Sequence, residues 1–293
     1  MGGLARIVVS KYGRIPDEEL SLILEVMNEC YNRLMPHEVS LVDLYIFESF
    51  SLVESFIMRE RMSLGVSTTP FLEETFFAMH DAWRGIPRII LSLDKLRVLP
   101  ELVKAGGIRH EVGHTVLHGS LQYYLLAFPT HLLWMMNEFN LPPEYARDIL
   151  YLVSIAVKDY EVTRLLYRRG YIVDQVEYIK FLLKESGDEI LSWSLSRGSS
   201  FLESMHVASL LKVVGCAAPL LMDKNFGNEI KVRLTRYLSH LPEDLSKDIV
   251  SIAERNFMEL GDDTFQNISS MIEKCNFIFS KIFRRQCKQN EQS

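Results

Sequence analysis

Alternating and continuous apolar runs predict short strands in the first third of the chain. Arg6–Ser10 and Val39–Phe50 have the pattern of partly buried strands. Phe76–Trp83 and Arg88–Leu93 flank the turn Arg84-Gly85-Ile86-Pro87 and predict a β-hairpin. We therefore expect a small sheet near the N-terminus.

Helical periodicity lies between these strands and continues to the end of the chain. An amphipathic helix opens at Pro16-Asp17-Glu18-Glu19 and runs to about Met35, with acidic residues at the positive end of its dipole. Gly106-Gly107 is expected to break the chain before a helix over Ile108–His118. The other predicted helices cover 51–62, 94–103, 120–137 with a break at Pro129, 142–169, 176–186, 200–214, 228–240, 243–259 and 264–284.

These patterns predict an α+β fold in which a small N-terminal sheet is followed by a mostly α-helical part. We expect an N-terminal domain over 1–172 and a helical domain over 173–293. The long helix that ends near Arg169 can be shared by both parts, so the sequence does not fix the boundary to a single residue.

Composition indicates a packed globular protein. Hydrophobic residues make up 48% of the chain, charged residues 24%, and the net charge is −6. An acidic balance argues against a nucleic-acid partner, because phosphate contacts need a basic surface. The four cysteines are far apart and form no C-x-x-C pair, and the N-terminus carries no long apolar run. We therefore expect reduced thiols and a cytoplasmic location.

One apolar stretch has to be tested as a membrane segment. Val112–Asn137 contains no Asp, Glu, Lys or Arg, but its cleanest part, Leu121–Met136, is interrupted by Pro129. That part is shorter than the roughly 20 residues that a membrane-spanning helix needs. We expect buried core here and no transmembrane segment.

The pentapeptide His110-Glu111-Val112-Gly113-His114 has the form H-E-x-x-H. On a helix, the two histidines lie one turn apart on the same face and can bind one metal ion. The neighbouring Glu111 can then reach a water on that metal and act as its general base. The motif predicts one catalytic Zn²⁺ held by His110 and His114.

A catalytic zinc usually has a third protein ligand. The metzincin pattern would place a histidine at position 120, which is Ser120, so that pattern fails. His118 lies one turn beyond His114 on the same helix. Three ligands in a row along one helix match a tetrahedron poorly, so we expect His118 to pack behind the metal ligands.

An acidic residue on a later helix is the alternative third ligand. The candidates are Asp159 and Glu161, about 200° apart around a helix. Asp159 shares its face with apolar residues, where an isolated carboxylate is costly unless something neutralises it. Glu161 shares its face with Lys158, Arg164 and Arg168, which favours a solvent-exposed position. We expect Asp159 as the ligand and keep Glu161 as the alternative.

These residues resemble the gluzincin-like branch of the zincin metallopeptidases. The segment Lys158-Asp159-Tyr160-Glu161-Val162-Thr163-Arg164 is similar to the E-Y-x-x-D-R segment of the HtpX and CAAX-prenyl-protease zinc peptidases. Asp159 stands where those families place the ligand Glu, and Thr163 where they place an Asp, so both positions depart from the pattern. The resemblance covers roughly residues 85–170 and implies a zincin-like catalytic domain, in a chain without the transmembrane hairpins of those peptidases.

The resemblance also implies an activity and a peptide or protein substrate. Glu111 would take a proton from water and return it to the leaving amine during peptide-bond hydrolysis. An edge strand would bind the substrate main chain, with Arg88–Ser92 as the candidate.

Four side chains are candidates for stabilising the oxyanion, namely Tyr123, Tyr124, Tyr160 and His206. His206 is expected to be a satisfied core histidine. The alternative function is a non-peptidase in which the metal is structural or regulatory and the helical part binds a protein partner.

Overall fold

The computed structural model describes residues 5–63 and 76–290, without the side chains of 286–290. The chain forms two compact units. The first unit consists of residues 1–125 and 168–178, and the second of residues 126–167 and 179–293. The units thus place 126–167 with the helical remainder, whereas the domains expected over 1–172 and 173–293 place it in the N-terminal part. The domain boundary stays a prediction.

The first unit is built on a mixed sheet of β1 (Arg6–Tyr12), β2 (Leu41–Phe47), β3 (Ala78–Asp81) and β4 (Arg88–Ser92). The strand order is β1-β2-β4-β3. β1, β2 and β4 are parallel, and β3 pairs antiparallel with β4 as the other half of a hairpin. The predicted strands and the hairpin are confirmed, and so is the α+β class.

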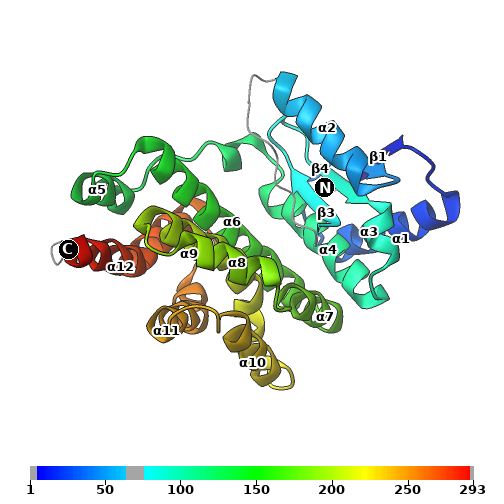
Figure 1. Cartoon of the computed structure of the whole chain (residues 1–293). Coiled ribbons are helices and arrows are strands. Elements are labelled where there is room, and N and C mark those ends of the chain that lie inside the picture. Colours follow the sequence, from blue (N-terminus) through cyan, green and yellow to red (C-terminus); the bar gives the residue numbers. More distant parts are fainter. Residues whose placement is uncertain (1–4, 64–75, 291–293) are drawn as a thin grey trace. The chain divides into compact units, whose positions relative to one another are not determined.

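Helices lie on both faces of this sheet (Figure 1). One face packs against α2, where Val53 and Ile57 meet Phe47 and Ile90 in an apolar cluster that also includes Met79. On the other face α1 and α4 pack together, joined by a buried hydrogen bond of 2.7 Å between the hydroxyls of Tyr31 and Thr115. The helical elements of this unit are α1 (Asp17–Arg33), α2 (Phe50–Ser63), α3 (Leu93–Arg97), α4 (Glu101–His118) and the 3₁₀ turn η1 (Leu121–Tyr124).

The helix that carries the H-E-x-x-H motif begins earlier than expected. Gly106-Gly107 do not break the chain, because α4 runs through them without interruption. The glycines instead allow close packing within the first unit. A Cβ on Gly106 would lie 2.5 Å from the carbonyl oxygen of Asp174, and one on Gly107 would lie 2.3 Å from the ring of Phe77.

The second unit is helical throughout its described regular elements. The long helix α6 and helix α7 each cross from one unit to the other along the chain. The elements are α5 (Thr130–Phe139), α6 (Pro143–Arg168), α7 (Val173–Leu182), α8 (Gly187–Ser196), α9 (Ser200–Ala217), η2 (Ala218–Leu220), α10 (Gly227–Tyr237), α11 (Glu243–Ser251), η3 (Ile252–Asn256), η4 (Phe257–Glu259) and α12 (Thr264–Asn290).

Two parts of the second unit differ from expectation. Helix α8 was not predicted, although Ser186 caps it by accepting a hydrogen bond from the Asp188 amide. The helix expected over 243–259 is regular only to Ser251 and continues as a π turn and a 3₁₀ turn. The single helix expected over 94–103 is divided between α3 and the start of α4, and the segment expected to be helical over 120–128 contains only the 3₁₀ turn η1, so these two expectations are wrong. The other predicted helices are confirmed, with ends displaced by a few residues.

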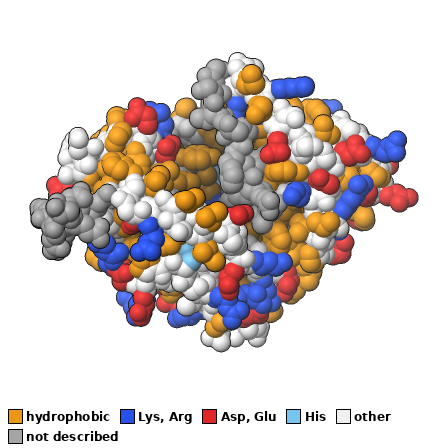
Figure 2. Space-filling model, in the orientation of Figure 1, with side chains coloured by type: hydrophobic (Ala, Val, Ile, Leu, Met, Phe, Trp, Pro, Cys, Tyr) orange, Lys and Arg blue, Asp and Glu red, His pale blue; other side chains and the backbone are white. Residues whose placement is uncertain are grey.

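The surface and the apolar helices bear on the expected environment of the protein. Acidic, basic and hydrophobic side chains are interspersed on the face drawn in Figure 2. By length and composition, Ser200–Leu220 is the one helix of the described residues that could cross a membrane, and 61% of its apolar window is buried, as in the core helix of a soluble protein. Cys30, Cys216 and Cys275, the cysteines whose side chains the structure describes, are buried and are not joined in a disulfide, which agrees with the expected reduced thiols.

Candidate functional site

Helix α4 brings the two motif histidines together. His110 and His114 are 2% and 6% exposed, and their Nε2 atoms lie 3.2 Å apart. Zinc–nitrogen bonds of about 2.0–2.1 Å in a tetrahedron separate two ligand atoms by about 3.3–3.4 Å. The two imidazoles therefore already have the spacing that one zinc ion requires.

The general-base candidate Glu111 lies beside a histidine that the sequence did not reveal. His80, on β3, stacks on His114 with a ring-centroid distance of 4.5 Å and an interplanar angle of 6°. Its Nδ1 lies 3.9 Å from Oε2 of Glu111. Ligating atoms of His80, Glu111 and His114 all lie within 4.8 Å of one another, so the first unit itself forms a cluster able to hold a metal ion.

The pleat of the hairpin explains why His80 faces α4. Met79 pairs with Ile90, and both belong to the apolar cluster under α2. Successive side chains of a strand point to opposite faces, so His80, paired with Ile89, points to the face that α4 covers. The hairpin was predictable, and its alternation was the signal that could have found His80.

His118 packs behind the two motif histidines, as expected. It is 1% exposed, and its Nδ1 lies 3.3 Å from Nδ1 of His114. That contact uses the ring nitrogen of His114 opposite to the one that faces His110. The rings of Tyr123 and Tyr178 lie 5.1 Å from His118 and 5.4 Å from His110, respectively. These contacts fix ring orientation around the histidine pair.

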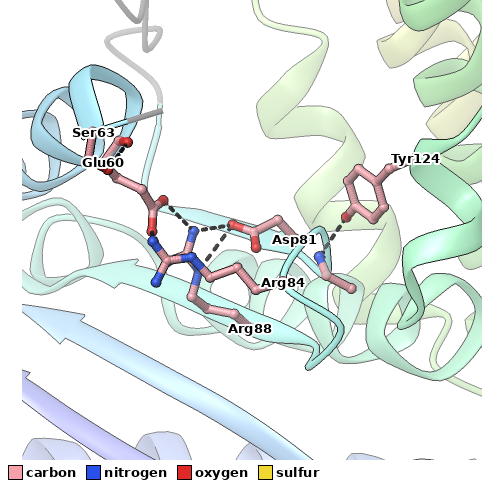
Figure 3. A network of polar contacts seen from close by, with 7 residues as sticks. Glu60, Ser63, Asp81, Arg84, Arg88 and Tyr124 are labelled. Atoms are coloured by element: carbon pink, nitrogen blue, oxygen red, sulfur yellow. Dashed lines mark hydrogen bonds and ion pairs between the residues drawn. The ribbon is translucent and has the colours of Figure 1, made fainter. Parts of the chain in front are cut away.

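A buried ion network holds strand β3 in place (Figure 3). The guanidinium of Arg88 bonds Asp81 at 2.6 Å and both carboxylate oxygens of Glu60 at 2.8 and 2.9 Å, and Arg84 adds a bond of 2.6 Å to Glu60. Arg88 is 4% exposed. Beyond the strand, the hydroxyl of Tyr124 accepts a hydrogen bond of 2.8 Å from the amide of Ala82. The strand that carries His80 is therefore anchored at its Asp81 end.

Helix α4 is anchored separately by Arg109, the residue before the motif. Its guanidinium bonds Asp174 at 2.8 Å and Glu29 at 3.2 Å, and it lies over the ring of Tyr171. Burial opposes the charged form of Arg109, but its hydrogen bond to Asp174 and the negative charges of Asp174 and Glu29 outweigh burial, so the pKa of Arg109 is raised. Such charge-assisted bonds restrict rotation of the helix that presents His110 and His114.

Asp159, the expected third ligand, lies on α6 in the second unit. It is 4% exposed, so the expectation that its helix face points inward is confirmed. His110 and His114 belong to the first unit, and the role of Asp159 as a metal ligand stays a prediction.

The expectation that Glu161 is a surface charge is wrong. Glu161 is 5% exposed, and its two carboxylate oxygens accept hydrogen bonds from Thr264 Oγ1 at 2.8 Å and Asn267 Nδ2 at 2.5 Å. Its neighbour Lys158 is 9% exposed, and burial lowers the pKa of that amine to about 8, against the opposing charges of Asp159 and Glu161. The helical phase argument failed because α12 covers the face of α6 that its basic residues had suggested was open.

The expectation that Arg88–Ser92 is the edge strand that binds the substrate is wrong. Arg88–Ser92 forms β4, which lies between β2 and β3 and uses both of its edges for pairing. Among the strands that the structure describes, β1 and β3 are the edges, and β3 is the one that contacts α4 through His80. The edge strand beside the motif is therefore Ala78–Asp81.

The four oxyanion candidates now differ in their surroundings. Tyr123 lies against His118, and Tyr124 is bonded to Ala82. Tyr160 is 2% exposed and packs on Phe257 in the second unit. His206 is a buried histidine of the second unit with partners of its own, as expected. Tyr123 and Tyr124 are the candidates that lie in the same unit as the motif.

Comparison of the chain with protein-family models, curated proteins and solved structures finds no match.

Proposed function

We propose that this protein is a zinc-dependent metallopeptidase that hydrolyses peptide bonds in a cytoplasmic peptide or protein substrate. One observation carries the proposal: two buried imidazoles at zinc spacing, 3.2 Å apart, flank a buried glutamate on a single helix. A purely structural metal site needs no general base, so Glu111 favours catalysis. The resemblance of the motif to the zincins supports the same activity.

The donor set suits zinc, which binds imidazole nitrogen and carboxylate oxygen. His110 and His114 would hold the ion together with Asp159. When bound, zinc polarises a carbonyl group and lowers the pKa of water toward about 7. The chain itself supplies the proton transfer: Glu111 accepts the proton of the attacking water and gives it to the nitrogen of the leaving amine.

Strand β3 fits the role of substrate strand. An extended peptide can add to the edge of a sheet through main-chain hydrogen bonds. Pairing with β3 would lead the substrate past His80 and along the helix face that carries Glu111. Anchoring by Arg88 would keep this edge in register with the motif.

Zinc content measured by mass spectrometry tests the proposal. The wild type and Glu111→Gln should each retain zinc, whereas His110→Ala, His114→Ala and Asp159→Ala should each lose one equivalent. Glu161→Ala should keep its zinc, because Glu161 is bonded to Thr264 and Asn267. His131→Ala is the matched control, since its side chain is 45% exposed on α5.

Activity is the second readout. Wild type is incubated with a peptide library, and cleavage products are identified by mass spectrometry. Products should appear with wild type and His131→Ala and be absent with Glu111→Gln. If His110→Ala binds as much zinc as wild type, the site is wrong, and if Asp159→Ala does so, only the third ligand is wrong. Cleavage by Glu111→Gln at the wild-type rate would remove the proposed mechanism.

A further inference from the structure

A second pair of facing histidines lies wholly within the second unit. His206 comes from α9 and His240 from the turn after α10, and their Nε2 atoms are 3.2 Å apart. Glu189, on α8, places Oε2 3.9 Å from Nε2 of His206. Three separate elements thus contribute two facing imidazoles and a carboxylate that lies beside one of them, His206.

The hydrogen-bond partners of the two Nδ1 atoms determine which ring nitrogens of this pair carry a proton. Nδ1 of His240 lies 3.0 Å from the carbonyl oxygen of Tyr237, which can only accept, so Nδ1 carries the proton and Nε2 a lone pair. Nδ1 of His206 lies 3.2 Å from Oγ of Ser192. If this nitrogen donates to Ser192, then Nε2 of His206 also carries a lone pair. Two lone pairs would then face each other at 3.2 Å, an arrangement that a cation between them stabilises.

A relay of neutral hydrogen bonds is the competing arrangement. In it Ser192 donates to Nδ1 of His206, whose Nε2 donates to His240. The carboxylate of Glu189, 3.9 Å from Nε2 of His206, favours the arrangement with a cation, because a negative charge beside the pair stabilises a cation and takes no part in the relay. A metal ion could use this carboxylate as a ligand. The hydroxyl of Tyr237 orients Glu189 by donating a hydrogen bond of 3.4 Å to its Oε1.

We propose that His206, His240 and Glu189 form a second binding site for a divalent transition-metal cation of the zinc class. A histidine pair with one carboxylate is a common zinc donor set, and water would complete the tetrahedron. The nitrogen separation of 3.2 Å is close to the roughly 3.3–3.4 Å that two zinc ligands require. The side chain of Glu189 is 31% exposed, and a shift of its carboxylate toward His240 would complete the donor set.

The protonation state of the pair suits metal binding. Burial, and then the charge of His240, lower the pKa of His206 to about 4, and burial also lowers the pKa of His240. Both rings are therefore neutral at neutral pH, which is the form that ligates metals. His240 is half-buried, so an ion can reach the pair from solvent.

The site would brace a weakly packed helix. Of α8, only Trp193 and Ser196 are buried, and Trp193 packs against the ring of His206. A cation shared by Glu189, His206 and His240 would tie α8 to α9 and to the end of α10. This role is independent of the proposed peptidase activity, since the first unit contributes no ligand to it.

Metal binding by the full-length chain tests this site in isolation. The His110→Ala/His114→Ala double variant is stripped with chelator, equilibrated with Zn²⁺, passed through gel filtration and assayed by mass spectrometry. One equivalent should remain bound. Adding His206→Gln or His240→Gln should abolish it, and adding Glu189→Gln should weaken affinity by at least about tenfold. Adding His131→Gln, which removes the half-exposed histidine 3.7 Å from Glu273, should change nothing.

The stoichiometry also separates this proposal from the peptidase proposal. Wild type should bind two equivalents if both are right and one if only the second site exists, and that one should survive His110→Ala. The second site is overturned if the double variant binds no zinc, or if the added His206→Gln leaves binding intact. Circular dichroism checks the fold, and Glu189→Gln supplies a variant at a partly exposed position should a histidine change unfold the unit.

Discussion

The two histidine pairs have the same 3.2 Å separation between Nε2 atoms but different surroundings. In the first unit both rings come from one helix, a third ring stacks on His114, and Glu111 directly follows His110 in the chain. In the second unit the rings come from separate elements, and the nearby carboxylate Glu189 is itself bonded to Tyr237. The difference indicates that the carboxylate sets the chemistry: a glutamate adjacent to the ligands can move a proton, whereas one shared as a ligand can only hold the ion.

Replacing Glu111 should give the largest effect. Glu111→Gln keeps the size of the side chain but removes the base, so peptide hydrolysis should fall by about 10²- to 10⁴-fold while zinc stays bound. The measurement is the turnover rate on a fluorogenic peptide chosen from the library. Glu273→Gln, at a half-exposed carboxylate of α12, is the control and should hydrolyse as wild type does. Equal rates for wild type and Glu111→Gln would make the first pair, like the second, a binding site only.

Loss of Arg88 should have the next largest effect, a loss of stability in the unit that carries the first pair. Arg88→Met leaves the buried carboxylates of Glu60 and Asp81 without their main cation, so the unfolding free energy should fall by about 3–5 kcal/mol. Urea denaturation of the full chain measures it. Arg97→Met, at an arginine whose side chain is 46% exposed and pairs with Glu19, should change little. If the unfolding free energy of Arg88→Met changes as little as that of Arg97→Met, then β3 does not depend on this network.

The same contrast explains how far the sequence could be interpreted. His110 and His114 lie one turn apart on one helix, so their spacing alone revealed the first pair. The strands, the hairpin and most helices followed from local periodicity. His206 and His240 are 34 residues apart in the chain and meet only through packing, so no spacing rule could pair them. His80 had a local signal in the hairpin pleat, but its partner His114 comes from another element.

Glu161 shows where helical phase misleads. Its neighbours along α6 are basic, which is typical of a solvent face, yet α12 returns over that face and supplies Thr264 and Asn267. Arg164 likewise donates to the carbonyl oxygens of Leu260 and Gly261. Polar residues that bond a later segment have the same sequence pattern as polar residues in water, because periodicity records polarity and not exposure.

Acid should weaken the second unit through His206. With chelator present, the folded pKa near 4 lies below the ordinary 6.5, so the unfolded chain binds more protons between these values. Stability from this neutral ring is complete above pH 6.5 and is lost as the pH falls toward 4, by roughly 2–3 kcal/mol. Urea midpoints across this range measure the loss. The urea midpoint should depend less steeply on pH in His206→Gln than in wild type, and as steeply as in wild type in His131→Gln. An equally steep dependence in His206→Gln would assign the acid sensitivity to other groups.

Changes at His80 should be the smallest and the most informative about the first pair. His80→Ala removes both the ring stacked on His114 and the nitrogen 3.9 Å from Glu111, so zinc affinity should fall by about tenfold. His80→Phe keeps a stacked ring and should recover most of that affinity, because the stack fixes the plane of His114. Competition with a chelating dye measures affinity, and fluorogenic peptide turnover is measured in parallel. If His80→Phe binds zinc normally but hydrolyses more slowly, the His80 nitrogen positions Glu111. If both variants match wild type in affinity and turnover, the first pair needs no third ring and relies, as the second pair does, on two imidazoles and a carboxylate.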